Sequence, residues 1–575
     1  MKINSFKYMK LHFLVMLLLF ISLNSCDEAE ILEEKPLDFF SATNAFVTPA
    51  DFNAALLENY NIIRNNFYEA DGSNSFRVLS WGITDMSYPH KDWGPYPNLE
   101  SMLLSTSNVV ENLWFPLYEV IFNANVVLNR VEGAQAELKE SEKAAVIGEA
   151  AFFRAWSYKL LANIFGDVPV TIEEITEPKR DYIQSSRQEV YQQSATDFEL
   201  AAANLPGIDD APDVTRVSKQ VAQHYLAEVY ISLGRYQDAV DATSAIIDHG
   251  STALMTQRFG TRMNDPEFGG DVYWDLHRKG NSSREMGNTE SLWVIPFDFD
   301  TRESGGGDGG PGVRCQVPRL WQLKLPNADG SQSAITPHPN ERYYGRGGGF
   351  TRPSPYFLET IWEKSGYDTD IRNSEYNIQR DFKVENPASD HNGKWLIKDN
   401  LPVPLNTFND TLRNFWPVVA KASTPGNFPD EVLLEDQTIP GSINSSGPAK
   451  RNWKNHYALR LAETYLLRAE AYLAIGDMQK AADDINIVRS RANAPEVESS
   501  MVDIDYILDE RMRELHFETH YLATLMRLGK AVERAKENFP YVGNSLMEKH
   551  NLWPIPFSEI EKNSGAQLNQ NPGYN

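Results

Sequence analysis

Apolar residues recur every three or four positions along most of this chain, the spacing of an amphipathic helix. The segment "RQEVYQQSATDFELAAANLP" (187–206) shows the pattern clearly. The segment "EKAAVIGEAAFFRAWSYKLLANIFGDVPV" (142–170) predicts one long helix ended by Gly166 and Pro169. The same spacing predicts further helices over residues 50–66, 109–132, 214–232 and 502–536. We therefore expect a mainly α fold in which most of these apolar side chains form the core.

Two distant segments repeat one helical pattern. "YLAEVYISLGRYQDAVDATSAII" (225–247) and "YLLRAEAYLAIGDMQKAADDINIV" (465–488) align on Gly234 and Gly476. Small residues, Ala227 and Ala469, stand seven positions before each glycine. A helix, a glycine turn and a second helix with small contact residues is typical of tetratricopeptide (TPR) repeats. These copies lie far more than one TPR period apart. If the helical pairs pack together, the long chain segments between them must lead away from the helices and back again.

Two regions lack helical periodicity. Residues 250–450 contain "ESGGGDGGPG" (303–312), "GRGGG" (345–349) and many prolines, which favour loops. Within them "SLWVIPF" (291–297) predicts a short strand. A similar irregular piece covers residues 71–108. Because loops on a rigid frame often carry the binding residues, these regions are where we expect the ligand to bind.

The N-terminus predicts a lipoprotein leader. Three lysines precede an apolar stretch from Leu11 to Leu23, which is too short to span a bilayer. The run "LNSC" (23–26) resembles a bacterial lipobox, in which lipid is attached to the cysteine and the chain is cut before it. We therefore expect residues 1–25 to be a signal peptide and Cys26 to be the lipid attachment site. Cys315 is the other cysteine, so we expect no disulfide within the mature chain.

The formal net charge of −25 over 575 residues argues against some classes of binding partner. Binding to nucleic acid relies on basic surface, so such an acidic chain is a poor candidate for it. It has no polybasic patch to hold anionic lipid, so the acyl group must provide membrane attachment.

Several segments, in order, resemble the SusD/RagB family of outer-membrane lipoproteins. They cover almost all of the mature chain. They are "LEEKPLDFFSATNAFVTPADFNAAL" (32–56), "LYEVIFNANVVLNRV" (117–131), "EAAFFRAWSYKLLANIFGDVPV" (149–170), "YALRLAETYLLRAEAYLAIGDMQKAADDINIVRSRAN" (457–493), "ILDERMRELHFETHYLATLMRLG" (507–529) and "LWPIPFSEIEKNSGAQLNQNPGYN" (552–575).

The resemblance implies a SusD-like helical fold over residues 26–575 with about four TPR-like helix pairs. We expect that scaffold at about 40–70, 109–250 and 450–540, and a loop-rich ligand-binding region at about 71–108 and 250–450. It also implies a lipoprotein on the outer membrane of Bacteroidetes-type bacteria, facing outside the cell. Such a protein binds an oligosaccharide or polysaccharide and closes as a lid over a SusC-like TonB-dependent transporter. The acids of "DEAE" (27–30) resemble the surface-export signal of such lipoproteins.

No segment carries a convincing catalytic or metal motif, so we expect neither enzyme activity nor a cofactor. "HFETH" (516–520) spaces two histidines four apart, but Phe517 stands where a zinc protease needs its glutamate. "DFDTRESGGGDG" (298–309) begins like a calcium loop, but Arg302 and Glu303 occupy positions that require an oxygen ligand and glycine. Neither a structural calcium ion nor a phosphate loop is indicated.

Aromatic residues in the loops are the candidates for sugar contact, because sugar rings pack on aromatic faces while polar groups bind the hydroxyls. The opposing interpretation is that each ring fills a small core of the loop region. We expect that core role for Trp81 and Trp293. The predicted ligand-binding residues are Trp93, Tyr96, Trp274, Trp321, Tyr343, Tyr344 and Arg346.

Three other functions stay open. A peptide could be the cargo, which would favour a backbone-pairing edge over an aromatic platform. A surface glycosidase would need two carboxylates about 5–10 Å apart beside a cleft. A TPR scaffold for other proteins would leave the aromatic loops unexplained. The identity of the sugar, its linkage and its length are beyond the sequence.

Overall fold

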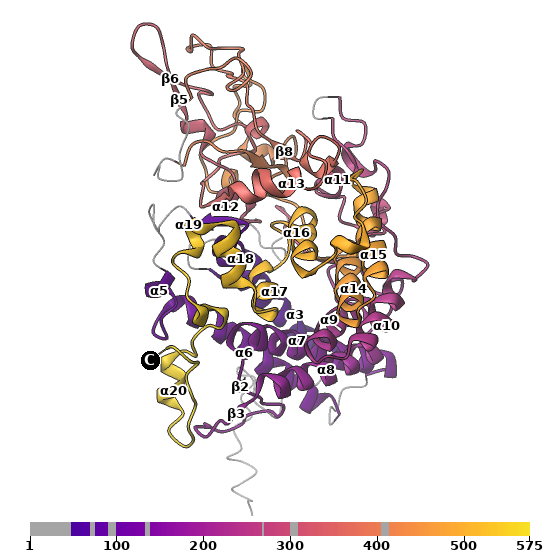
Figure 1. Cartoon of the computed structure of the whole chain (residues 1–575). Helices are drawn as coiled ribbons and strands as arrows, with labels where there is room; N and C mark the ends of the chain where they lie inside the picture. Colours follow the sequence, from indigo (N-terminus) through magenta and orange to yellow (C-terminus); the bar gives the residue numbers. More distant parts are fainter. Residues whose placement is uncertain are drawn as a thin grey trace, which may run out of the picture.

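The computed structural model places a loop-rich region against one side of a curved frame of helices (Figure 1). It describes residues 46, 48–69, 75–89, 99–132, 138–266, 269–299, 309–403 and 413–574. The frame uses both ends of the chain, and the middle of the chain supplies the loops. This bears out the mainly helical fold expected from the sequence.

Seven helices form a row in which each packs on the next: α6, α7, α8, α9, α10, α14 and α15. The longest, α7, lies between α6 and α8 and is buried on nearly every face from Val146 to Phe165. The charged side chains buried in this stretch are paired, Arg154 with Asp197 at 2.6 Å and Lys159 with Glu228 at 2.8 Å. Gly166 ends the helix at φ +76°, as the sequence predicted. The longer helices are α3 (Pro49–Ile63), α6 (Asn108–Val131), α7 (Glu140–Phe165), α8 (Arg187–Asn204), α9 (Lys219–Ser232), α10 (Tyr236–Ile247), α14 (Leu461–Ile475), α15 (Met478–Arg491) and α16 (Ile504–Leu515).

The two repeated segments form helical hairpins that pack on each other. Gly234 (φ +74°) joins α9 to α10, and Gly476 (φ +91°) joins α14 to α15. Helix α10 packs on α14, so the long segment between the two copies returns to the helical frame. Ala227 and Ala469 are fully buried, as expected for small residues at helix contacts.

Two expectations from periodicity were wrong. Residues 502–536 form three helices, α16, α17 (Tyr521–Arg527) and α18 (Ala531–Asn538), because the backbone turns left-handed at Phe517 (φ +59°) and Gly529 (φ +67°). The irregular piece 71–108 contains the buried helix α4 (Phe76–Gly82), whose first turn is capped by Ser75.

Short antiparallel ladders tie the loop-rich region together. The strand expected at 291–297 is β4 (Ser291–Ile295), which pairs with β10 (His456–Arg460). Because Ile295 lies opposite His456, the chain from 296 to 455 leaves and rejoins the frame at one place. The other strands of the described residues also pair in twos, and the pairs are β1 (Ser87–Pro89) with β7 (Thr351–Pro353), β2 (Val168–Pro169) with β3 (Gln184–Ser185), β5 (Lys324–Pro326) with β6 (Gln332–Ala334), and β8 (Ile378–Gln379) with β9 (Val418–Val419).

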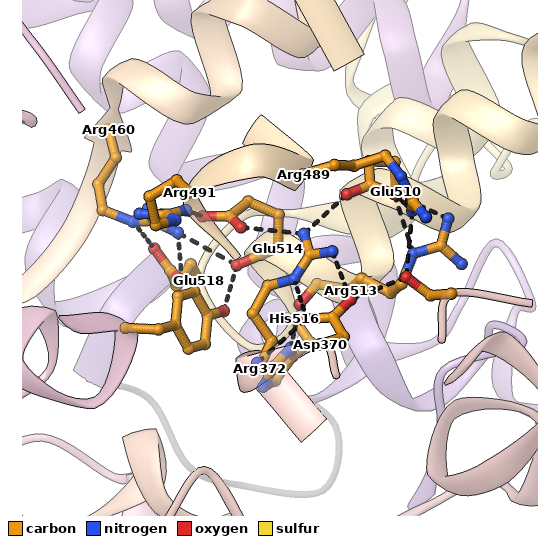
Figure 2. Close-up of polar contacts among 12 residues, drawn as sticks. Asp370, Arg372, Arg460, Arg489, Arg491, Glu510, Arg513, Glu514, His516 and Glu518 are labelled. Atoms are coloured by element: carbon orange, nitrogen blue, oxygen red, sulfur yellow. Dashed lines mark hydrogen bonds and ion pairs between the residues drawn. The ribbon is translucent and has the colours of Figure 1, made fainter. Parts of the chain in front are cut away.

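A buried ionic network joins the frame to the loop-rich region (Figure 2). Glu514 of α16 accepts hydrogen bonds from Arg460 at 2.9 Å, from Arg372 at 3.2 Å and from Arg491. All four side chains are almost completely buried. Arg372 belongs to the loop-rich region and Arg491 to α15, so one carboxylate connects both parts of the fold.

The loop-rich region also has an apolar core of its own. Trp274, Tyr343 and Tyr344 pack there with aliphatic residues such as Leu323 and Val384. Trp81 and Trp293 are buried as expected, with exposures of 1% and 0%, but they belong to the main core and not to the small core of the loop region.

Candidate ligand-binding site

A cavity of about 570 Å³ opens in the loop-rich region. That volume lies in the range of small-ligand sites, which is about 300–1,000 Å³. Its walls combine aromatic rings with side chains of both charges. The lining residues are Trp274, Arg342, Tyr343, Tyr344, Glu375, Tyr376, Ile378, Gln379, Arg380, Asp381, Lys383, Glu385, Trp395, Lys398 and Pro425.

Trp274, Tyr343 and Tyr344, which were predicted as ligand-binding residues, share this cavity. Their exposures are only 2%, 4% and 5%, so they form its wall while filling the core behind it. The two interpretations of these rings, ligand contact and core filling, are therefore compatible. Ligand contact by each of them stays a prediction.

Local interactions position Trp274 and Tyr343. Trp274 lies in α11 (Val272–Leu276), where its backbone N–H donates to the side chain of Asp271 at 2.8 Å. Arg278 stacks over the indole with its guanidinium carbon 4.1 Å from the ring centre. The hydroxyl of Tyr343 donates to the carbonyl of Lys383, and burial raises the pKa of that phenol. Burial also raises the pKa of the Tyr344 phenol, so both tyrosines stay neutral at physiological pH.

Two aromatic rings in the cavity, Tyr376 and Trp395, were missed from the sequence. Tyr376 is 38% exposed and Trp395 is half-buried, so both offer more surface to a ligand than the three predicted rings do. Lys398 lies 4.7 Å above the indole of Trp395. Both rings stand among polar residues in the loop-rich region, which is the signal that was applied to the other aromatics.

Two of the three carboxylates that line the cavity, Asp381 and Glu385, have structural partners. Asp381 accepts backbone N–H groups from Phe382 and Ile397 at 2.8 Å and from Lys398 at 3.0 Å, which fixes the loop that carries Trp395. Glu385 pairs with Arg342 at 3.4 Å. This arrangement suits hydrogen bonding to hydroxyl groups.

Trp321 and Arg346, also predicted as ligand-binding residues, are not among the residues that line the cavity. They form a separate pair in which the Arg346 guanidinium carbon lies 5.4 Å from the centre of the Trp321 ring. The indole N–H of Trp321 donates to the carbonyl of Gly347 at 3.3 Å. The predicted platform is therefore divided between two places in the loop-rich region.

Three predicted residues, Cys26, Trp93 and Tyr96, lie outside the described residues. The ladder that precedes Trp93 and Tyr96 is described, and its Tyr88 lies opposite Arg352. The roles of these three residues stay predictions.

The histidine pair of "HFETH" does not keep helical spacing. His516 follows the last residue of α16, and its ring contacts the carbonyl of Arg513, while His520 contacts the carbonyl of Phe67. Within the described ranges, no group of three or more His, Cys, Asp or Glu side chains is placed to hold a metal ion. None of the helices in that part of the chain is both long and apolar enough to cross a membrane.

Comparison with known proteins agrees with this fold. A family model described as the SusD family matches residues 289–574. A second, described as starch-binding and associating with the outer membrane, matches residues 45–231. A SusD-like protein from Formosa agariphila is 23% identical over 96% of each chain. The starch-binding protein SusD of Bacteroides thetaiotaomicron is 34% identical over 20% of this chain and 21% of its own.

Solved structures extend the likeness to the whole fold. A laminarin-binding SusD-like protein superimposes with a TM-score of 0.62 at 21% identity, over 91% of this chain and 99% of its own. The surface glycan-binding protein A of Bacteroides thetaiotaomicron, in complex with laminarihexaose, gives a TM-score of 0.64 at 19% identity over the same shares. Both family models, the full-length relatives and these structures agree, and the chain belongs to the SusD/RagB family.

Proposed function

We propose that this protein is a surface glycan-binding lipoprotein of the outer membrane that delivers an oligosaccharide or polysaccharide to a SusC-like TonB-dependent transporter. It would act by binding and by closing over the transporter, without chemistry. The observation that carries the proposal is the cavity of about 570 Å³ with exposed aromatic rings, in a protein whose relatives include laminarin- and starch-binding proteins.

The cavity suits a sugar for physical reasons. Tyr376 and Trp395 present flat apolar faces for the C–H groups of a pyranose ring. Gln379, Arg342 and Lys383 offer hydrogen bonds to hydroxyl groups around them. A few convergent polar groups beside aromatic surface give orientation and specificity to such a site.

Partnered carboxylates favour binding over hydrolysis. A glycosidase needs one carboxyl group that donates a proton and a second that attacks or activates water. Asp381 is held by three backbone N–H groups and Glu385 by Arg342. Two of the three cavity carboxylates therefore already serve the local structure, and Glu375 alone does not supply the pair that hydrolysis needs, which supports a binding role.

Calorimetry with single ring truncations tests the proposal. A glycan array on the mature chain, with Cys26→Ala to remove the lipid, identifies the glycan. Titration calorimetry then compares Tyr376→Ala and Trp395→Ala with the parent. Loss of a stacking ring should weaken binding roughly ten- to a hundredfold while the melting temperature changes little.

Phe557→Ala is the matched control, because that ring is 40% exposed, against 38% for Tyr376, but lies on α20 (Phe557–Lys562). It should bind the glycan as the parent does. Unchanged affinity in both cavity variants would show that the ligand binds elsewhere, and an array with no glycan bound would refute glycan binding. Co-purification of the lipidated protein with a transporter barrel tests the delivery role separately.

A further inference from the structure

Arginine residues gather around the glycine run "GRGGG" (345–349), although the chain as a whole is strongly acidic. Residues 312–353 contain six basic and two acidic side chains, against a net charge of −25 for the chain. Three arginines of this segment, Arg314, Arg319 and Arg346, lie close to Arg413 or to one another. Like charges placed together cost energy unless an anion is there to bind.

The glycine run brings these arginines together. The 347–349 backbone passes so close to residues 314–318 that a Cβ at Gly347 would collide with the carbonyl of Pro318, and one at Gly348 with that of Arg314. Gly349 donates its N–H to the carbonyl of Val317 at 2.9 Å. The glycines therefore allow a close approach of two loops, and this packing holds Arg346 beside the segment that carries Arg314 and Arg319.

Two of the arginines, Arg319 and Arg346, have no acidic partner among the described residues. Each has a buried Nε that makes no hydrogen bond in that part of the structure, while the side chain as a whole is only half-buried. Burial, followed by the charge of Arg413, lowers the pKa of Arg319, and burial, followed by Arg314, lowers that of Arg346. The strongest ionic neighbours of both groups are therefore positive.

One aromatic ring connects the group. The guanidinium carbons of Arg314 and Arg413 lie 5.0 Å and 5.9 Å from the centre of the Phe350 ring. Arg346 stacks over Trp321, which stands two residues after Arg319. Stacking on Trp321 fixes the plane of the Arg346 guanidinium group and leaves its N–H edge to bind an oxyanion.

We propose that Arg319 and Arg346, together with Trp321, form a subsite for the anionic group of an acidic glycan, a carboxylate or a sulfate ester. The inference rests on the proposed glycan-binding function and names the class of its ligand. Planar guanidinium groups bind carboxylate and sulfate oxygens through paired, charge-assisted hydrogen bonds. The indole would pack against the adjacent sugar ring. Tyr344 of the cavity wall and Arg346 of this subsite stand two residues apart in one loop, and we expect one extended ligand to contact both.

The experiment compares acidic with neutral glycans. The mature chain carrying Cys26→Ala is screened on an array that holds uronate-bearing, sulfated and neutral oligosaccharides. Calorimetry follows with oligogalacturonate, carrageenan oligosaccharides, laminarihexaose and any stronger array ligand, at 50 and 500 mM salt. Binding of an acidic glycan, weakened at high salt, is expected.

Charge variants then locate the subsite. Arg319→Gln and Arg346→Gln should each weaken the acidic glycan about ten- to a hundredfold, because each removes a charged hydrogen-bond donor. Arg346→Lys keeps the charge but loses the planar fork, so it should recover only part of the affinity. Arg235→Gln is the matched control, because this arginine is exposed on the frame and pairs with Asp238 at 2.6 Å. Melting temperatures confirm that each variant is folded.

The outcomes separate the two proposals. If only neutral glycans bind, or if an acidic glycan binds both Gln variants as it binds the parent, the anionic subsite is refuted while glycan binding stands. If no glycan binds, whether neutral or acidic, the proposed function fails and the subsite fails with it. Preference for uronate over sulfate, or the reverse, identifies which oxyanion the two arginines bind.

Discussion

Removing the charge of Glu514 should destabilise the protein strongly. Its carboxylate is fully buried and accepts hydrogen bonds from three arginines, Arg372, Arg460 and Arg491. Burial opposes ionisation of Glu514, but the three arginines outweigh it and hold the pKa of the carboxyl far below its usual value. Glu514→Gln keeps the size of the side chain and one acceptor, so its effect reports the lost charge.

The expected cost follows from burial. Breaking a buried ion pair by removing one partner costs about 3–5 kcal/mol, because the remaining charge is left in a poorly polarisable interior. Each arginine keeps a second acid: Asp370 for Arg372, and Glu290 for both Arg460 and Arg491. We therefore expect about 3 kcal/mol, the lower end of the range.

Urea unfolding followed by tryptophan fluorescence measures this cost as a shift of the midpoint. The control is Glu533→Gln, which breaks a pair of 2.6 Å with Lys530 on the surface, where the acid side chain is 49% exposed. Exposed pairs contribute about 0–1 kcal/mol, so the control should unfold close to the parent. If Glu514→Gln unfolded at the same urea concentration as Glu533→Gln, the network would not hold the two parts of the fold together.

Three more predictions concern other parts of the chain. Cys26→Ala should move the protein from the outer membrane to a soluble fraction, and a variant that stayed with the membrane would contradict the lipid anchor. Ala469→Phe should cost roughly 1–3 kcal/mol or more by overpacking a fully buried helix contact, and an unchanged melting temperature would disagree. Burial lowers the pKa of His224 and His520 to about 3, so between about pH 3 and 6.5 the unfolded chain binds more protons than the folded one. Stability is then complete above about pH 6.5 and is lost as the pH falls, which melting temperatures at pH 7.5, 6 and 5 measure.

Much of the helical frame could be predicted from the sequence, because a 3.6-residue pattern and glycine ends are local features. The sequence correctly predicted the helices on either side of Gly234 and of Gly476. It also predicted the end of α7 at Gly166. The breaks within 502–536 were not predicted, because the left-handed turn at Phe517 depends on what surrounds that residue.

The binding surfaces were decided by the tertiary structure. Composition pointed to loop aromatics as a class, and the fold divided them: Trp274, Tyr343 and Tyr344 line one cavity, and Trp321 pairs with Arg346 in another place. The sequence could not show whether Arg319 and Arg346 pair with acidic residues. The chain has 79 acidic residues, and only the folded loops determine which charges lie together. Periodicity acts over a few residues and specifies helices, whereas a cavity requires segments distant in sequence to meet in space.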